Sequence, residues 1–327
     1  MAVEIEDVIA AQARISPYIH KTPVMQSERL NELVGCNLFF KCENLQKAGA
    51  FKSRGAVNAV FSLSDKQAKN GVATHSSGNH GAALARAAKL RGISSTIVVP
   101  SDAKQVKKAA ILSYGAQIIE CEPTLAARID TLERVVRDTG AHFVHPYDDD
   151  LIISGQGTAA LELFEQVESL DSLVVPVGGG GLLAGSATVA YPAIKVYAAE
   201  PEMADDAYRS LKTGELVTRH IPRTLCDGLQ TTVGVRNFAI MQDKVSDVLL
   251  VSEEEIIDAM RLLWTRLKQV IEPSSAVTLA AVLRNQETFS GQRVGLILTG
   301  GNVDPDDLPF SPGQQSEPRN SRNQLSW

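Results

Sequence analysis

Short apolar segments alternate with longer helical patterns along nearly the whole chain, and this alternation limits the folds that the chain can adopt. Residues 37–41, 95–99 and 294–298 are apolar strand candidates, whereas residues 52–63 and 124–139 have helical spacing. Strands interleaved with helices are typical of βαβ units, which build a mostly parallel sheet covered by helices. We therefore expect an α/β protein.

The pattern extends over further segments. We expect other helices over residues 5–15, 81–91, 104–114 and 252–271, and other strands over 71–74, 117–120, 172–177, 196–199 and 247–251. Ser252 and Glu255 have the spacing of a capping box at the start of the last helix. The two βαβ series indicate two α/β lobes, with the chain turning between them near residues 146–153.

Charge and cysteine usage exclude several classes of protein. The 327 residues hold 32 Lys and Arg against 38 Asp and Glu, a net charge of −6, which argues against a nucleic-acid binder. The four cysteines are scattered without a C-x-x-C pair, so neither a zinc site nor a disulfide framework is indicated. Residues 172–194 carry no charge, but they contain four consecutive glycines and two prolines, so we interpret them as strand, turn and helix rather than a membrane span.

The composition of the two ends of the chain supports two further predictions. The N-terminus is acidic and lacks the apolar core of a signal peptide, so we expect a cytoplasmic protein without membrane attachment. Residues 305–327 are rich in Pro, Ser, Gln and Asn, and we expect the tail over residues 314–327 to be disordered.

Four segments contain candidate catalytic or ligand-binding residues. Lys52 lies within Phe-Lys-Ser-Arg-Gly at a loop-to-helix junction, where it is either an ordinary surface lysine or a lysine of lowered pKa that forms Schiff bases. Residues 75–81 join a strand to a helix through small residues, which suits either a capped turn or a site for an anion. The run Gly178–Gly181 after an apolar strand allows close approach to a phosphate. Residues 298–304 end the last strand with Thr-Gly-Gly-Asn, where an open sheet places ligand contacts.

These segments together resemble those of a known family. Phe51 to Gly55, Ser76 to Gly81, Gly178 to Gly181 and Gly300 to Asn302 occur in the order found in fold-type II pyridoxal-phosphate enzymes of the serine racemase and threonine/serine dehydratase group. The resemblance runs from about Ile5 to Asp304. It implies a tryptophan synthase β-like fold of two open twisted α/β lobes with the cofactor between them. The large domain would comprise residues 1–70 and 148–313, and a small mobile domain residues 71–147.

The resemblance also implies roles for single residues. Lys52 would form the Schiff base with pyridoxal 5'-phosphate, and Phe51 would pack near its ring. Asn79 would bind the phenolic oxygen, and Thr299 would face the pyridine nitrogen. The phosphate would be held by Gly178, Gly179, Gly180 and Gly181. The substrate carboxylate would be bound by Ser76, Ser77, Asn79 and His80.

Ser77 carries a second implication. In the racemase branch this serine faces the lysine across the cofactor, so that Ser77 and Lys52 act as bases on opposite faces of Cα. In a pure dehydratase Ser77 would only bind the carboxylate. We expect serine racemisation together with dehydration of serine to pyruvate and ammonia.

Further features resemble the racemase branch. Glu200, the carbonyl of Ala204 and Asp206 match its site for Mg²⁺ or Ca²⁺, although an acidic loop is commonly a solvated surface. Arg128 falls where the branch has an arginine that enters the closed site. ATP is a candidate allosteric ligand: Lys47, Tyr114 and Asn302 fit parts of the family's ATP site, but Ala48 and Ala82 replace polar residues there. We expect a homodimer with a small amino-acid substrate.

The alternatives are a dedicated ammonia-lyase for serine, threonine or threo-3-hydroxyaspartate, for which Arg128 would suit the second carboxylate, and an aspartate racemase. Outside the family, we weighed a cofactor-binding protein without turnover and an NAD-dependent oxidoreductase. The presence of both Lys52 and Ser77 argues against the first. The glycine run Gly178–Gly181 fits the dinucleotide fingerprint only because every residue in it is glycine, which argues against the second.

Overall fold

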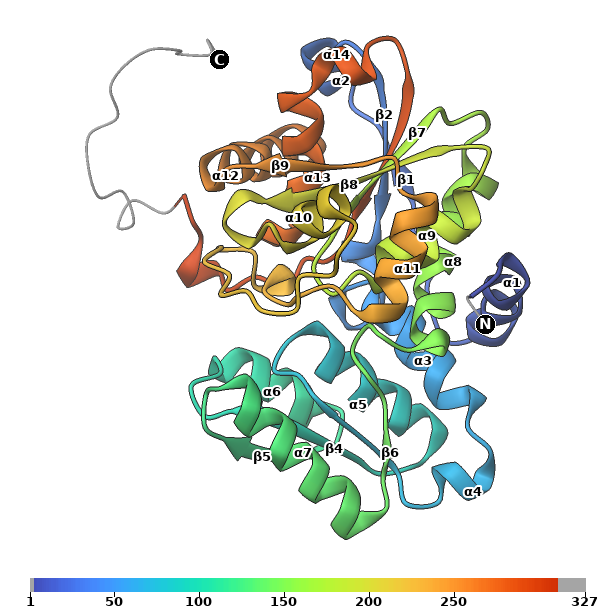
Figure 1. Cartoon of the computed structure of the whole chain (residues 1–327), viewed down its shortest axis with the longest axis vertical. Coiled ribbons are helices and arrows are strands. Elements are labelled where there is room, and N and C mark those ends of the chain that lie inside the picture. The colour runs from blue at the N-terminus through green and yellow to red at the C-terminus, as the bar shows by residue number, and fades with distance from the viewer. Residues whose placement is uncertain (1–2, 311–327) are drawn as a thin grey trace.

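The computed structural model describes residues 3–310, and these form two lobes that lie one above the other in Figure 1. Each lobe is built on its own open sheet, of six strands in the large lobe and four in the small lobe. The α/β prediction is confirmed. The tail predicted over residues 314–327 lies outside the described residues.

The sheet of the large lobe has the order β1-β2-β10-β7-β8-β9 and is parallel except for β1, which pairs antiparallel with β2. Its strands are β1 (Val24–Met25), β2 (Asn37–Cys42), β7 (Ser172–Pro176), β8 (Lys195–Pro201), β9 (Asp247–Val251) and β10 (Arg293–Leu298). All of these strands were predicted from the sequence except the two-residue strand β1.

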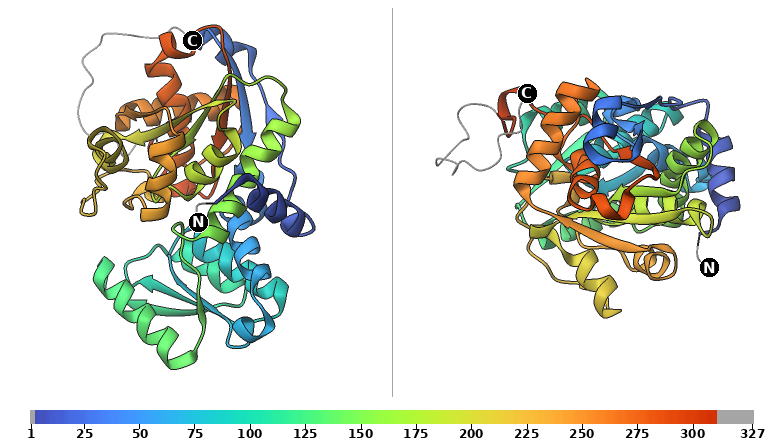
Figure 2. Two further views of the ribbon diagram at one scale, coloured as in Figure 1. Left: turned by 45° about the vertical axis from the view of Figure 1, so that its right-hand side comes forward. Right: turned by 90° about the horizontal axis from the view of Figure 1, so that it is seen from above.

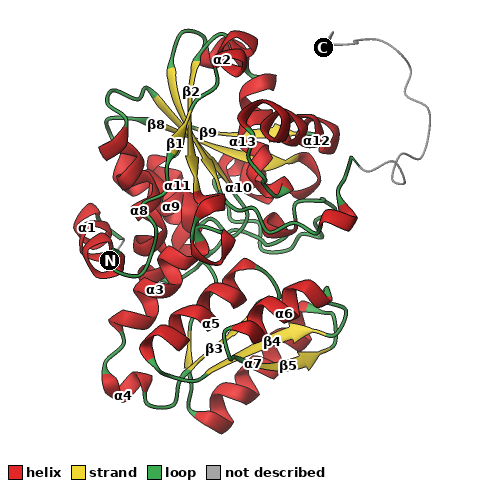
Figure 3. Ribbon diagram, turned by 180° about the vertical axis from the view of Figure 1, so that it is seen from behind, coloured by secondary structure: helices red, strands yellow, loops and turns green. Residues whose placement is uncertain are grey.

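Helices cover both faces of this sheet (Figure 3). Side chains alternate between the faces along a strand: Leu173 and Val175 pack in the cluster with α8 and α9, whereas Val174 packs in the cluster with α12 and α13. The helices of the large lobe are α1 (Ile5–Ile15), α2 (Glu28–Val34), α3 (Lys52–Ser62), α8 (Asp150–Gln166), α9 (Gly181–Ala190), α10 (Asp206–Thr213), α11 (Val235–Lys244), α12 (Glu253–Leu262), α13 (Pro273–Arg284) and α14 (Gln286–Phe289).

The small lobe contains a parallel sheet of order β5-β4-β3-β6. Along β4, Ile97 and Val99 pack toward α5, and Val98 packs toward α7. The short helix α4 (Asp65–Ala68) leads into it, and its elements are β3 (Val72–His75), α5 (Asn79–Arg91), β4 (Ser95–Pro100), α6 (Gln105–Ser113), β5 (Gln117–Cys121), α7 (Leu125–Thr139) and β6 (His142–Phe143). Figure 2 shows this sheet lying below the large lobe, with α7 on its outer side.

One helix prediction needs correction, and several helices were not predicted. The helix predicted over residues 252–271 begins with the expected capping box at Ser252, but α12 ends at Leu262. A π turn follows, and Lys268 at φ +60° stops the helix. The helices that were not predicted are α2, α4, α8, α10, α11, α13 and α14. In α8, Gly155 and Gly157 interrupt an apolar segment without clear periodicity. These glycines let α8 cross its neighbours closely: a Cβ at Gly155 would lie 2.6 Å from the Cα of Gly55 on α3.

The charge-free stretch at residues 172–194 forms β7, a glycine turn and α9, as predicted. Within residues 3–310 we find no helix with the length and apolar character needed to cross a membrane. The four cysteines are all free thiols.

Candidate active site

A cavity of about 1060 Å³ lies between the two lobes and collects nearly all the residues that the sequence singled out. The ends of β3 and β4 and the start of α5 supply its small-lobe wall, while the turn after β7 and the end of β10 supply the large-lobe wall. The predicted residues that line it are Phe51, Lys52, Ser76, Ser77, Asn79, His80, Arg128, Gly178, Gly179, Gly180, Gly181 and Thr299. Glu200, Ala204 and Asp206 lie outside it.

Lys52 is the first residue of α3 and is partly exposed to the cavity. Its Nζ donates a hydrogen bond to the carbonyl of Pro146 at 2.9 Å and lies 5.1 Å from the centre of the Phe51 ring. Burial lowers the pKa of Lys52 to about 8, and the negative charge of Glu272 acts in the opposite direction. A lysine with this pKa is partly neutral near pH 8, as a nucleophile toward an aldehyde must be.

The turn Gly178–Gly181 joins β7 to α9 at an edge where only glycine fits. Gly180 has φ +89°, and a Cβ at Gly179 would lie 2.2 Å from Cγ of Tyr147. In the described part of the chain, the N–H groups of Gly178 and Gly179 donate to no acceptor, and the turn opens directly into the first turn of α9. Free N–H groups at a helix N-terminus form a cradle for a phosphate.

Asn79, the first residue of α5, is held between two partners from the large lobe. Its Nδ2 lies 2.9 and 3.1 Å from the two carboxylate oxygens of Glu272, and its Oδ1 accepts a hydrogen bond from Asn302 at 2.8 Å. Burial raises the pKa of Glu272 to about 8. The amide of Asn79 is thereby fixed with its donor side toward Glu272 and its acceptor side toward Asn302.

Thr299 at the end of β10 is 4 % exposed, and its Oγ1 lies 3.0 Å from Oγ of Ser275. Ser275 also bonds to both the N–H and the carbonyl of Gly300. The carbonyl of Thr299 accepts from the N–H of Phe51, so this strand end and the start of α3 are tied together. A neutral hydroxyl held in this way suits an aromatic ring nitrogen that stays unprotonated.

The small-lobe wall is polar and carries histidines kept neutral. Burial lowers the pKa of His75 to about 4, and the neighbouring charge of Arg128 adds to the effect. Burial also moves the pKa of His80 well below its usual range. Ser76 accepts a hydrogen bond from the N–H of Gly78 at 3.4 Å, and Ser77 faces the cavity. Neutral donors of this kind can bind a carboxylate without competing charge.

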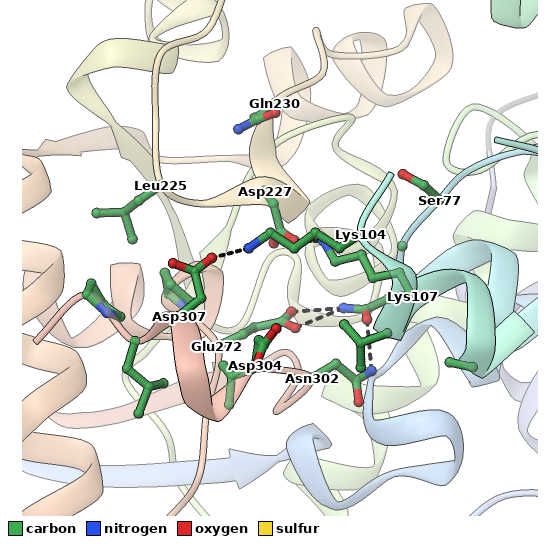
Figure 4. Close-up of a pocket in the computed structure, with 18 of the residues that line it drawn as sticks. Ser77, Lys104, Lys107, Leu225, Asp227, Gln230, Glu272, Asn302, Asp304 and Asp307 are labelled. Carbon is green, nitrogen blue, oxygen red and sulfur yellow. Dashed lines mark hydrogen bonds and ion pairs between the residues drawn. The ribbon is translucent and has the colours of Figure 1, made fainter. Parts of the chain in front are cut away.

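A second cavity of about 450 Å³ adjoins the first and shares Ser77, Asn79 and Glu272 with it (Figure 4). Two ion pairs cross between the lobes here: Lys104 with Asp307, and Lys107 with Asp227. Ala82 and Asn302, two of the residues weighed for ATP, line this second cavity, whereas Lys47, Ala48 and Tyr114 do not.

Glu200 and Asp206 lie together in the large lobe, apart from both cavities. Glu200 accepts hydrogen bonds from the N–H groups of Ala207 and Tyr208, and Asp206 accepts one from Val233. Burial raises the pKa of Asp206 to about 6, and that of Glu200 well above its usual range, with the charge of Asp206 adding to it. Within the part of the chain that the structure covers, no three His, Cys, Asp or Glu side chains form a metal-binding group.

Three residues of the site were not predicted from the sequence. Glu272 falls just after the overlong helix prediction, so it was not considered as a buried carboxylate. Pro146 acts through its carbonyl, which no side-chain motif reveals. Tyr147, which packs on Gly179, was treated only as part of the turn between lobes; the signal that could have identified it is an aromatic residue in a short polar linker.

A lysine of lowered pKa, a glycine turn with free N–H groups and a buried hydroxyl at the end of β10 lie around one cavity between two α/β lobes. These groups suit an enzyme that holds a phosphorylated aldehyde cofactor. The family comparison agrees. A family model described as "Pyridoxal-phosphate dependent enzyme" matches residues 15–300, and the chain belongs to this family.

The chain is also similar to individual proteins and solved structures. The chain is 52% identical over 310 residues to a beta-hydroxyaspartate dehydratase of Paracoccus denitrificans, covering 94% of this chain and 98% of that protein. It is similar to the crystal structure of serine racemase from Dictyostelium discoideum, with a TM-score of 0.89, 50% identity and coverage of 92% of this chain and 99% of that one. It is also similar to the structure of maize serine racemase, with a TM-score of 0.91, 44% identity and coverage of 94% and 95%.

The predicted fold class is confirmed: the protein has the fold of the fold-type II pyridoxal-phosphate enzymes. It is an enzyme of the family of pyridoxal-phosphate-dependent amino-acid racemases and ammonia-lyases. An amino acid is therefore its class of substrate.

Proposed function

We propose that the protein interconverts L- and D-serine and also dehydrates serine to pyruvate and ammonia. The observation that supports this is that Lys52 and Ser77 line one cavity, Lys52 from the large lobe and Ser77 from the small lobe. Racemisation needs two proton-exchanging groups at Cα, and these two residues provide an amine and a hydroxyl.

The residues present fit pyridoxal phosphate. Lys52 would carry the aldehyde carbon, Gly178 to Gly181 would hold the phosphate, and Thr299 would face the ring nitrogen. When bound, the cofactor supplies an electron sink for the bonds at Cα. Asn79, whose amide is oriented by Glu272 and Asn302, would bind the phenolic oxygen from the start of α5.

The chain's own side chains then carry the protons. The free amine of Lys52 removes the Cα proton, and Ser77 returns a proton to give the other enantiomer. Loss of the β-hydroxyl with a proton releases one water instead, and a second water later hydrolyses the product to pyruvate and ammonia. Closure of the small lobe, residues 71–147, over residues 1–70 and 148–313 would keep solvent water away from Cα.

A second candidate is the dehydration of threo-3-hydroxyaspartate, and Arg128 favours it. Its guanidinium lines the cavity, and within residues 3–310 it has no hydrogen-bond or ion-pair partner. A cationic group without a partner at this place suits a second carboxylate on the substrate. The beta-hydroxyaspartate dehydratase of Paracoccus denitrificans, at 52% identity, agrees with this candidate.

We also propose that Mg²⁺ or Ca²⁺ binds at Glu200, the carbonyl of Ala204 and Asp206. Within residues 3–310 these two buried carboxylates form no ion pair with Lys or Arg, and they offer hard oxygens that a divalent cation would neutralise. ATP as an allosteric ligand, the homodimer and the cytoplasmic location stay predictions.

The test is product analysis of the purified enzyme loaded with pyridoxal phosphate. L-serine, L-threonine and L-threo-3-hydroxyaspartate are supplied in parallel, and D-serine and keto acid are both quantified. D-serine alongside pyruvate is the expected result. Keto acid without any D-serine would make the protein an ammonia-lyase, and turnover that survives Lys52→Ala would contradict the assignment of the lysine.

A further inference from the structure

The loop over residues 216–223, between α10 and the 3₁₀ turn Asp227–Leu229, brings a second arginine to the cavity. Thr218, Arg219, His220 and Ile221 line the cavity from the large lobe. The loops of the large lobe between α10 and α11 lie on the side that faces the small lobe in Figure 1. Arg219 is exposed, and in the described structure its guanidinium has no hydrogen-bond or ion-pair partner.

The loop is anchored at three points. The N–H of Val217 donates to Oγ of Ser210 at 2.9 Å, and the N–H of Arg223 donates to the carbonyl of Met203 at 2.9 Å. Between these ends, Nδ1 of His220 lies 3.0 Å from the guanidinium of Arg209. The backbone that carries Arg219 is therefore held on both sides.

Arg209 also pairs with an acidic residue, Asp205 at the N-cap of α10. Its Nε donates to Asp205 at 2.9 Å, so that carboxylate is already paired. Within the described part of the protein, Arg219 forms no ion pair with an Asp or Glu side chain.

The cavity as a whole is cationic, although the chain has a net charge of −6. Five Lys or Arg line it against three Asp or Glu, and Glu272 has a pKa raised to about 8. Lys107 is paired with Asp227, and Lys104 with Asp307. Apart from Lys52, the cations of the lining that form no ion pair within residues 3–310 are Arg128 and Arg219, one from each lobe.

We propose that Arg219 is a specificity-determining residue, which binds the distal carboxylate of a dicarboxylic 3-hydroxy amino acid together with Arg128. The proposal rests on the proposed function, because it concerns the substrate of that same site. A guanidinium presents two parallel N–H donors to a carboxylate, and two guanidinium groups from opposite lobes would bind its two oxygens when the lobes close. The phosphate of the cofactor is accounted for by the glycine turn, so it does not need Arg219.

Steady-state kinetics test this with two substrates. The ratio of kcat/KM for L-threo-3-hydroxyaspartate over L-serine is measured in wild type, Arg219→Ala and Arg223→Ala. Arg223 is exposed on the same loop but does not line the cavity, so it is the matched control. Loss of one charge-assisted contact is expected to lower the ratio about 10- to 100-fold in Arg219→Ala. Arg223→Ala should keep the wild-type ratio.

Calorimetric titration of the loaded enzyme with succinate and with butyrate adds a readout that needs no turnover. The two probes differ by one carboxylate, and Arg219→Ala should weaken succinate binding at least about 10-fold relative to butyrate. If Arg128 and Arg219 share one carboxylate, the double Ala variant should lose less than the product of the single losses.

The outcomes separate the two proposals. An unchanged substrate ratio and unchanged succinate affinity in Arg219→Ala would overturn the role of Arg219. Wild type that turns over neither substrate would refute the proposed function, and the succinate titration would still decide whether Arg219 binds the carboxylate.

Discussion

Asn79 and Glu272 meet across the two lobes, with the amide nitrogen of Asn79 at 2.9 and 3.1 Å from the carboxylate oxygens. Asn79 opens α5 in the small lobe, and Glu272 directly precedes α13 in the large lobe. Glu272 is 4 % exposed, and its charge also acts on Lys52. The buried carboxyl group of Glu272 therefore orients the amide of Asn79 and also affects the pKa of Lys52 in the same site.

Glu272→Gln should change the pH dependence of cofactor uptake. Burial lowers the pKa of Lys52 to about 8, and the carboxylate of Glu272 raises it from what burial alone would give. Removing that charge should lower the pKa of Lys52 further. The rate at which apoenzyme takes up pyridoxal phosphate should therefore reach half its maximum at a lower pH than in wild type. For wild type we expect this midpoint at about pH 8. Stopped-flow absorbance between pH 6 and 10 measures this.

The control is Glu287→Gln, an exposed glutamate on α14, which should keep the wild-type midpoint. A midpoint that stays the same or moves to higher pH in Glu272→Gln would show that Glu272 does not act on Lys52 through its charge.

Ser77→Ala should separate the two activities of the site. If Ser77 returns the proton to one face of Cα, its loss should lower D-serine formation by about 100-fold or more, since general acid–base catalysis contributes on this scale, while part of the dehydration remains. Chiral chromatography and a keto-acid assay on the same reaction measure both. Equal losses of D-serine and pyruvate would mean that Ser77 only binds substrate.

The sequence predicted most strands of both sheets because their side chains repeat with period 2 or form short apolar runs, as in β4 and β7. It could not predict α8, since a helix buried against α3 and α9 needs no polar face and therefore lacks a 3.6-residue pattern. The resemblance located Lys52, Asn79 and the glycine turn.

The rest of the site depends on tertiary contacts. The carbonyl of Pro146 and the carboxylate of Glu272 reach Lys52 and Asn79 from positions 94 and 193 residues away in the sequence. Residues so far apart in the sequence form no local motif that could be recognised. The relation of Arg219 to the site likewise depends on the fold, which brings the loop over residues 216–223 to the cavity.

Gly179→Ala should weaken binding of pyridoxal phosphate. A Cβ at this position would lie 2.2 to 2.5 Å from the ring atoms of Tyr147, so the ring or the turn must shift and the N–H groups would leave the phosphate. We expect the Kd for the cofactor to rise at least about 10-fold, measured by equilibrium dialysis. Tyr147→Ala in the same chain removes the clash, and the double variant should recover part of the affinity. A double variant as weak as Gly179→Ala would show that the clash is not the cause.

Asp206→Asn should abolish the response of the protein to Mg²⁺ and change its pH dependence of stability. The pKa of Asp206 rises from 3.8 to about 6 on folding, so the folded state binds the extra proton between these values. The resulting stabilisation is fully present below pH 4 and is lost as pH rises through about 6, a change of up to about 3 kcal/mol in chelator. Mg²⁺ should offset this loss at pH 7.5 and raise the Tm of wild type.

Asp205→Asn is the matched control, because it removes the same charge from the neighbouring residue, whose carboxylate is paired with Arg209. Differential scanning calorimetry at pH 4, 6 and 7.5, with chelator and with Mg²⁺, should show the Mg²⁺ stabilisation in wild type and Asp205→Asn but not in Asp206→Asn. In chelator, the stability of Asp206→Asn should lack the decrease between pH 4 and 6 that the Asp206 carboxyl group causes in wild type. A wild type whose Tm is the same in chelator and in Mg²⁺ would mean that Glu200 and Asp206 bind no cation, and their raised pKa values would then reflect burial of two neighbouring carboxyl groups alone.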